Sequence, residues 1–303
     1  MTHRADALGL LVCPNCFGSL DVADHGGECA RCGTRCDLVH GIAVVCGSDD
    51  YAVSSPKAQQ AAYFDQDTDP EWEIERPRGA PALHRWMIEE KFRRSVSGLV
   101  GLSSTSGLAV CGGSGMDAEL LARAGANVVS TDISLGAAKR AAERAHRHDV
   151  SITVIVADAE RLPFANHSFD LVYVHDGLHH LEQPYAGLSE MLRVAGRAVS
   201  ITEPADAALT RLAVRGGVAE EVEEAGNRVE RLRLDDVVAA VERADFRILH
   251  AERYAMFYRH HPGWAMRAFS REPLLTAAKA TMRTGNRVFG RLGNKLVVVA
   301  VRS

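Results

Sequence analysis

The feature that most constrains the fold of this chain is a regular alternation of short apolar runs and helical patterns after residue 107. The runs GLAVCGG, ANVVSTD, SITVIVAD, FDLVYVH and RAVSITEP are mostly apolar, as strands buried on both faces are. Amphipathic segments such as MDAELLARAG and SLGAAKRAAERAHRHD separate them. Buried strands joined by helices predict right-handed βαβ units, so we expect an α/β fold with a Rossmann-like, mostly parallel sheet.

The C-terminal part adds a helix at LDDVVAAVERADF, a strand at RILHAERYAMF and a closing strand at KLVVVAVR, which brings the predicted sheet to seven strands. An insertion of about residues 259–294 separates the last two strands. From Arg259 to Lys295 it carries eight Lys or Arg residues and one acid, Glu272. Four apolar residues fall on one helical face: Leu274, Leu275, Ala278 and Met282. We expect a solvated helix that covers the substrate pocket, and a surface for RNA, a membrane or an anionic substrate is the alternative.

The overall composition is that of an ordinary globular protein. The chain has 303 residues, of which 47% are hydrophobic and 24% charged, and its net charge is −4. This acidity gives no support for a strongly nucleic-acid-binding surface. The N-terminus lacks a long apolar region with a small-residue cleavage site, and no run of about 18 uncharged apolar residues exists. We therefore expect no signal peptide, no transmembrane segment and a cytoplasmic protein.

Two closely spaced cysteine pairs lie near the N-terminus, in CPNC and CARC, with twelve residues between them. Four thiolates in two such pairs can close a tetrahedral shell, which is the chemistry of a structural zinc site. A redox dithiol is the main alternative, but the segment lacks a thioredoxin-like βαβ pattern. Cys36 and His40 are spare ligands, and either could replace one of the four. The predicted zinc ligands are Cys13, Cys16, Cys29 and Cys32.

These patterns divide the chain into three parts. Residues 1–46 are predicted to form a zinc ribbon. Residues 47–100 begin with a stretch rich in charge, Pro and Gly, which predicts a linker and loop, and continue with a helix at about 81–99 that forms part of a lid. Residues 101–303 are predicted to form the domain that contains the sheet.

Features at three consecutive strand ends indicate a nucleoside site. Glycines that follow the first strand let the backbone approach a ligand; they are Gly112, Gly113 and Gly115. Asp132 ends the second strand, where a carboxylate can accept hydrogen bonds from ribose hydroxyls. Asp158 ends the third strand and can accept from the exocyclic amine of adenine, while Ala159 offers backbone groups. No Lys-Ser/Thr follows the glycines, so a nucleoside is favoured over P-loop phosphate binding.

Residues 107–204 resemble the class I S-adenosylmethionine-dependent methyltransferases. The run ADAERLPFANHSFDLVYVHDGLHHLEQPYAGLSEMLRV is similar to the family's segment from the adenine-binding acid to the helix ending in Glu-Met-x-Arg-Val. The first motif departs from the family, because Ala109 replaces the usual acid and Cys111 replaces the first glycine. The resemblance implies S-adenosylmethionine as cofactor. The cofactor-binding residues that it implies are Cys111, Gly112, Gly113, Gly115, Asp132, Ile133, Asp158, Ala159 and His175.

The cysteine-rich segment carries a second resemblance. LLVCPNCFGSL followed by ECARCGTRCDLVHGIAVV is similar to the small zinc-ribbon domain that serves as an activator subunit for several RNA and protein methyltransferases. That domain also occurs fused to the N-terminus of bacterial methyltransferases. The resemblance implies a structural zinc ion and an N-terminal zinc ribbon attached to the sheet domain.

Methyl transfer from a sulfonium needs an aligned nucleophile and, for a hydroxyl or amine, a group that removes its proton. His175 and His179 follow the fourth strand, in the loop that faces the cofactor's methyl group in the family, and both are candidate catalytic residues. Packing of His179 against the sheet is the alternative.

The predicted function is methyl transfer from S-adenosylmethionine to an oxygen or nitrogen of a small-molecule acceptor. One alternative is a ribosomal- or transfer-RNA base methyltransferase, because bacterial enzymes of that kind also carry an N-terminal zinc module. Another is a non-catalytic module that senses the cofactor or docks a partner, because the first motif is altered. RNA and a second copy of the chain stay open as further partners.

Overall fold

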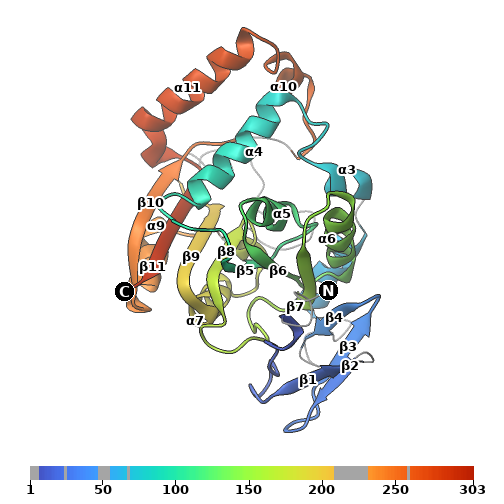
Figure 1. Cartoon of the computed structure of the whole chain (residues 1–303). Coiled ribbons are helices and arrows are strands. Elements are labelled where there is room, and N and C mark those ends of the chain that lie inside the picture. Colours follow the sequence, from blue (N-terminus) through green and yellow to red (C-terminus); the bar gives the residue numbers. More distant parts are fainter. Residues whose placement is uncertain (1–6, 24–25, 47–54, 67–68, 208–230, 258–259) are drawn as a thin grey trace.

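The computed structural model describes residues 7–23, 26–46, 55–66, 69–207, 231–257 and 260–303. An eleven-stranded sheet runs through them in the order β1-β2-β3-β4-β7-β6-β5-β8-β9-β11-β10 (Figure 1). The strands are β1 (Leu20–Ala23), β2 (Gly26–Cys29), β3 (Arg35–Val39), β4 (Ile42–Val45), β5 (Ser106–Val110), β6 (Asn127–Asp132), β7 (Ile152–Ala157), β8 (Phe169–His175), β9 (Ala195–Pro204), β10 (Phe246–Tyr254) and β11 (Lys295–Arg302).

Helices cover both faces of this sheet. They are α2 (Pro56–Asp65), α3 (Pro70–Glu75), α4 (Ala82–Ser95), α5 (Met116–Arg123), α6 (Leu135–Arg147), α7 (Pro184–Val194), α9 (Leu234–Arg243), α10 (Trp264–Ala268) and α11 (Leu274–Phe289), with short 3-10 turns η1 (Leu178–His180) and η2 (Gly290–Leu292). Helices α7 and α9 pack on one face, and α4, α5 and α6 pack on the other. The result is a three-layer α/β arrangement.

The centre of the sheet confirms the predicted α/β class. Strands β7, β6, β5, β8 and β9 pair in parallel, and β11 runs antiparallel between β9 and β10. Their inward side chains are buried on both faces, as the continuous apolar runs predicted. The seven predicted strands are β5 to β11.

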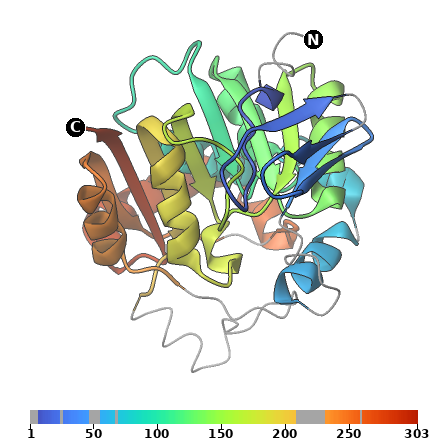
Figure 2. The same ribbon diagram turned by 90° about the horizontal axis from the view of Figure 1, so that it is seen from below.

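The N-terminal segment makes the sheet larger than the seven strands predicted. β4 pairs in parallel with β7, so that Ala43 lies opposite Ile155 and Val45 opposite Ala157. The ribbon strands β1–β3 continue outward from β4, at the edge opposite β10 (Figures 1 and 2). An exposed edge of β7 would be open to pairing with other chains, and β4 covers it.

The linker contains more regular structure than the sequence pattern predicted. Helices α2 and α3 lie where we expected only linker and loop. Each begins with a capping residue followed by proline: the Ser55 side chain accepts from the Ala58 N–H, and the Asp69 side chain accepts from the Trp72 N–H. From the sequence alone, we interpreted these prolines as turn signals. Proline at the first helical position is also a helix-start signal, and that signal was missed. The helix predicted at 81–99 is α4.

The insertion between β10 and β11 contains α10, α11 and η2. Leu275, Ala278 and Met282 pack against the core beside α4, as their shared helical face predicted. Leu274 departs from that prediction, because it is 47% exposed. Among the described residues, no helix has both the length and the apolar character needed to cross a membrane.

Candidate active site

A cavity of about 1160 Å³ opens at the carboxyl ends of β5, β6, β7 and β8. Ligands of open parallel sheets bind at this edge, beside the first strand where the strand order reverses. Loops after the strands form its floor, and α2, α3 and residues 256, 257, 260 and 261 form its cover. Eight of the nine residues predicted to bind the cofactor line this cavity: Cys111, Gly112, Gly113, Asp132, Ile133, Asp158, Ala159 and His175.

The glycine loop after β5 keeps an open backbone despite its altered sequence. Gly113 has a φ of +51°, and a Cβ placed there would meet no atom within 4 Å, so this backbone faces free space. Cys111 adopts φ +52°, the left-handed conformation that the glycine usual at this place would adopt freely. Gly115 is the predicted residue that does not line the cavity. Its Cβ would lie 3.0 Å from the Ala141 Cβ, so it allows close packing of α5 on α6.

Asp132, at the end of β6, binds the backbone of the glycine loop that follows β5. Its carboxylate accepts from the Gly113 N–H at 2.9 Å and from the Ser134 N–H at 2.9 Å. Burial raises the pKa of Asp132, while those two backbone N–H groups act in the opposite direction. The side chain is thus fixed in orientation at the cavity wall, where a diol could bind it.

Asp158 is held by a lysine that the sequence did not single out. The Lys57 ammonium, on α2, lies 2.5 Å from the Asp158 carboxylate and 3.1 Å from the Glu160 carboxylate. The side chains of Asp158 and Glu160 are only 3% and 7% exposed. Lys57 therefore occupies the hydrogen-bonding position that an amine donor of a ligand would use.

Helix α2 covers the cavity through contacts at both ends. Asp65 accepts from the Ser134 hydroxyl and from the Gly136 N–H, each at 2.6 Å. Gln60 donates to the His180 carbonyl at 2.7 Å. Tyr63 and Phe64 line the cavity from the same helix. These contacts hold α2 over the strand ends.

His175 reaches the cavity in a defined orientation. Its Nδ1 lies 3.0 Å from the Asp117 carboxylate, and the Tyr173 hydroxyl donates to the same carboxylate oxygen at 3.2 Å. The His175 side chain is 4% exposed, and its Nε2 is buried without a hydrogen-bond partner within the described structure. Nε2 lies 3.5 Å from the Asp176 carboxylate.

A second charged group lies beside this histidine. Asp176 accepts from Lys91 at 2.9 Å and from Lys295 at 2.6 Å. Burial alone would raise the pKa of Asp176, but the two ammonium groups outweigh it and hold that pKa well below its usual range. Asp176 is therefore an ionised anchor for two lysines rather than a proton acceptor.

His179, the other candidate catalytic residue, does not line the cavity. Its Nδ1 lies 2.8 Å from the Glu203 carboxylate, and Glu203 also accepts from the N–H groups of Gly177 and Leu178. Glu203 is 0% exposed and His179 4% exposed. This geometry corresponds to the packing alternative, in which the pair fixes the loop that carries His175.

Several cavity residues were missed by sequence reasoning. Lys57, Lys91, Asp117 and Lys295 lie on α2, α4, α5 and at the start of β11. Side chains on helices, and Lys295 at the start of an antiparallel strand, carry no signal of the kind found at the ends of parallel strands, so only the tertiary arrangement brings them together. Asp117 places a carboxylate in the cavity although the usual strand acid is replaced by Ala109, which is buried in β5.

The four predicted zinc ligands lie together at one end of the ribbon. Their Sγ atoms all lie within 4.8 Å of one another. Cys13 and Cys32 have Sγ atoms 3.4 Å apart, and Cys16 and Cys29 have Sγ atoms 3.5 Å apart. Neither Cys36 nor His40 joins this cluster within the described residues.

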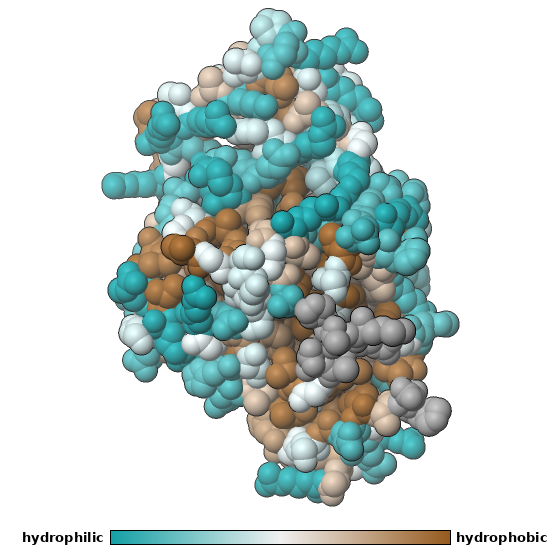
Figure 3. Space-filling model, in the orientation of Figure 1, coloured by the Kyte–Doolittle hydropathy of each residue, from teal (hydrophilic) through white to brown (hydrophobic). Residues whose placement is uncertain are grey.

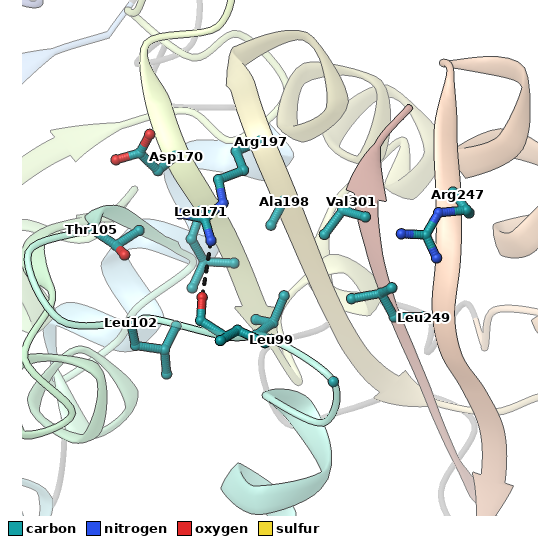
Figure 4. A pocket seen from close by; sticks show the side chains of 12 residues that line it. Leu99, Leu102, Thr105, Asp170, Leu171, Arg197, Ala198, Arg247, Leu249 and Val301 are labelled. Atoms are coloured by element: carbon teal, nitrogen blue, oxygen red, sulfur yellow. Dashed lines mark hydrogen bonds between the residues drawn. The ribbon is translucent and has the colours of Figure 1, made fainter.

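A second, smaller hollow of about 210 Å³ lies at the opposite ends of the strands. Leu99, Leu102 and Leu249 form much of its wall, and Arg197 crosses it to donate to the Val100 carbonyl at 2.9 Å (Figure 4). None of its lining residues is shared with the large cavity. This hollow belongs to the packing of the α4–β5 connection and not to the strand-end site.

Comparison with known proteins identifies part of the chain. Residues 108–198 match the family model described as a methyltransferase domain. The demethylmenaquinone methyltransferase of Renibacterium salmoninarum is 41% identical over 105 residues, which cover 34% of this chain and 43% of that protein. The one from Thermobifida fusca is 39% identical over 90 residues, covering 29% and 37%. The chain thus matches less than half the length of these relatives.

Solved structures share the fold over a longer stretch. Magnesium protoporphyrin IX methyltransferase (ChlM) from Synechocystis PCC 6803 with bound SAH superposes with a TM-score of 0.56 at 19% identity, covering 82% of this chain and all of that one. The cyclase SpnF superposes with a TM-score of 0.53 at 16% identity, covering 80% and 96%. Residues 108–198 are thus similar to the methyltransferase domain family, and the described chain has a class I methyltransferase fold.

Proposed function

We propose that the protein is an S-adenosylmethionine-dependent methyltransferase with a small-molecule acceptor. The observation that carries this proposal is the shared cavity, in which the open backbone of Gly113, the carboxylates of Asp132 and Asp158, and the His175 imidazole face one space. The first three match the needs of a nucleoside, and the fourth matches the need to accept a proton. The relatives named demethylmenaquinone methyltransferases support a small-molecule acceptor.

The cavity fits the cofactor in its donor and acceptor groups. Asp132 would hold the ribose hydroxyls, Asp158 the adenine amine, and the backbone from Cys111 to Gly113 the amino-acid end. When bound, the cofactor supplies an electrophilic methyl group on sulfur. The protein's own task is then to align an acceptor and remove its proton.

His175 is the proposed general base. A hydrogen bond from Nδ1–H to Asp117 leaves the lone pair of Nε2 to accept a proton from a bound acceptor that reaches it. Lys91 and Lys295 are held beside His175 by their ion pairs with Asp176. They supply positive charge near the place where an acceptor oxygen would become negative. His179 has the separate task of positioning the loop, through Glu203.

We also infer that the ribbon holds a structural zinc ion. Tetrahedral coordination at a Zn–S distance of about 2.3 Å places neighbouring sulfurs about 3.8 Å apart. The observed Sγ separations of 3.4 and 3.5 Å need only a slight expansion to admit the ion. Four thiolates would close the shell, so this zinc is structural rather than catalytic.

The first test of the function is calorimetric titration with S-adenosylmethionine and S-adenosylhomocysteine. The wild type is expected to bind both, and Lys57→Met is expected to bind S-adenosylmethionine about fivefold more tightly, because Lys57 competes for Asp158 and repels the sulfonium. The gain should be smaller for S-adenosylhomocysteine, which lacks that charge.

Asp132→Ala is the matched control in the same titration. It removes the ribose acceptor without touching Lys57, and it is expected to weaken both ligands by at least about tenfold. Absence of binding to the wild type would overturn the methyltransferase proposal. If Asp132→Ala bound both ligands with the affinity of the wild type, the ligand would occupy another place.

His175→Gln is expected to lower kcat about 100-fold with little change in the affinity for S-adenosylmethionine, because Gln keeps the hydrogen bond to Asp117 but cannot accept a proton. Demethylmenaquinone, in oxidised and reduced form, is the first acceptor to assay. A variant that kept the wild-type kcat would assign His175 a structural role.

A further inference from the structure

The insertion between β10 and β11 forms an arm, defined here as residues 260–292, which projects from one end of the molecule (Figure 1). It contacts the body through α4 and, at η2, through β10. Leu275 is the buried residue of α11, and Lys279 and Arg283 lie over the Trp86 ring at 6.0 and 5.4 Å. Ala278 and Met282 of α11 are partly buried against the core, and most of its other residues are exposed.

Large apolar side chains are concentrated on and beside this arm. Seven of the twelve exposed large hydrophobic residues in the described chain fall between residues 257 and 292, although this stretch is a small part of the sequence. Trp264 is 83% exposed, and Phe257 is 74% exposed. The other five are Phe269, Leu274, Val288, Phe289 and Leu292. Such a concentration marks an interaction surface rather than scattered surface residues.

The arm also carries a strong positive charge on an acidic protein. Residues 260–292 carry six basic and one acidic side chain, a net +5, whereas the whole chain carries −4. Arg267, Arg271, Arg287 and Arg291 are exposed, and within the described chain none of them forms a salt bridge. In Figure 3 the upper part of the molecule is dominated by hydrophilic residues with apolar ones between them. This charge separation would orient the arm toward an anionic surface.

Both ends of the arm frame the cavity described above. Phe257, His260 and His261 line the cavity where the insertion begins, and Asn294 and Lys295 line it where the insertion ends. A surface that binds the arm would therefore lie next to the cavity entrance. An apolar acceptor could pass between that surface and the site without crossing open water.

We propose that the arm docks on an anionic lipid membrane. Basic side chains bind acidic headgroups, and exposed Trp, Phe, Leu and Val side chains insert at the boundary with the acyl chains. An RNA partner would use the arginines and could stack on aromatic rings, but it would gain little from exposed Leu274, Val288 and Leu292. The apolar aliphatic component favours the membrane, and the proposal stands independently of methyl transfer.

Vesicle flotation of the full-length, zinc-loaded protein tests this proposal. The protein should float with vesicles that contain phosphatidylglycerol, bind vesicles of pure phosphatidylcholine far more weakly, and be released by high salt. Arg267→Gln/Arg287→Gln/Arg291→Gln should weaken binding by at least about tenfold, since each basic residue near the surface contributes about a kcal/mol. Trp264→Ser/Val288→Ser should weaken it as well, without changing the salt dependence.

Matched control variants show whether vesicle binding depends on the arm or on exposed charge anywhere on the protein. Arg35→Gln/Lys139→Gln/Arg243→Gln removes the same charge from other exposed places, and Val100→Ser removes an apolar residue that is 80% exposed away from the arm. Both should float like the wild type. Equal loss in these controls would overturn the proposal. So would binding of an RNA duplex or hairpin without vesicle binding, or sedimentation as a dimer that the Trp264→Ser/Val288→Ser variant dissociates.

Discussion

Removal of the zinc by a chelator, or by Cys13→Ser, is expected to unfold the ribbon and to release β4 from β7 while β5–β11 stay folded. The ribbon has strands of four or five residues and too little core to fold by itself. In comparable small domains, zinc binding contributes about 10 kcal/mol or more of apparent free energy. Hydrogen exchange by mass spectrometry should therefore show loss of protection in residues 20–45.

The same experiment has a consequence at the sheet edge. Without β4, the backbone groups of β7 become an open edge beside the cofactor cavity, so the zinc-free protein is expected to aggregate more readily. Cys36→Ser is the control, because Cys36 is buried in the ribbon but lies outside the four-sulfur cluster. It should keep one zinc ion per chain. Retained protection of the ribbon amides without zinc would contradict the metal assignment.

The sequence predicted the central sheet because its signal is local and strong. Strands such as β7 and β8 are buried on both faces, so their apolar character is continuous and the intervening helices alternate with them regularly. The pairing of β4 with β7 was not predicted. Residues 43 and 155 are far apart in sequence, and nothing in IAVV specifies which edge of a sheet it joins.

The site was predicted to the extent that it lies at strand ends. Asp132 and Asp158 follow parallel strands, and the carboxyl ends of such strands meet at one edge, so their proximity follows from topology alone. Lys57 and Asp117 come from helices whose placement depends on packing. Their charges act on Asp158 and His175, so sequence reasoning found the two acidic acceptors but not the groups that hold or orient them.

Glu119→Gln is expected to remove about 3 kcal/mol or more from the free energy of unfolding, because it leaves a buried guanidinium without its counter-charge. Glu119 is 4% exposed and lies 3.0 Å from Arg144, which is 0% exposed, while Arg78 and Arg123 pair with the same carboxylate. Glu143→Gln is the matched control on α6, since Glu143 is exposed and pairs with Arg147 at the surface. Urea unfolding at neutral pH should separate the two variants clearly.

Arg144 connects the loss of stability in Glu119→Gln to the glycine loop of the cofactor site. It donates to the carbonyls of Ser114, Arg76 and Glu73, so it ties the glycine loop to the cover formed by α3. If Glu119→Gln perturbs Arg144, cofactor affinity should fall together with stability, although Glu119 does not line the cavity. A variant that lost stability but bound S-adenosylmethionine normally would limit the role of this cluster to folding.

The pH dependence of the free energy of unfolding provides an independent test of the same cluster. Burial alone would raise the pKa of Glu119, but Arg78, Arg123 and Arg144 lower it to about 2. Because this folded-state pKa lies below the unfolded value of about 4.3, the contribution of Glu119 to stability is complete above that value and is lost as the pH falls toward 2. Glu119→Gln should therefore lie well below the wild type at neutral pH and approach it in acid. A difference that stayed constant down to pH about 2 would mean that the carboxylate charge is not what stabilises Arg144.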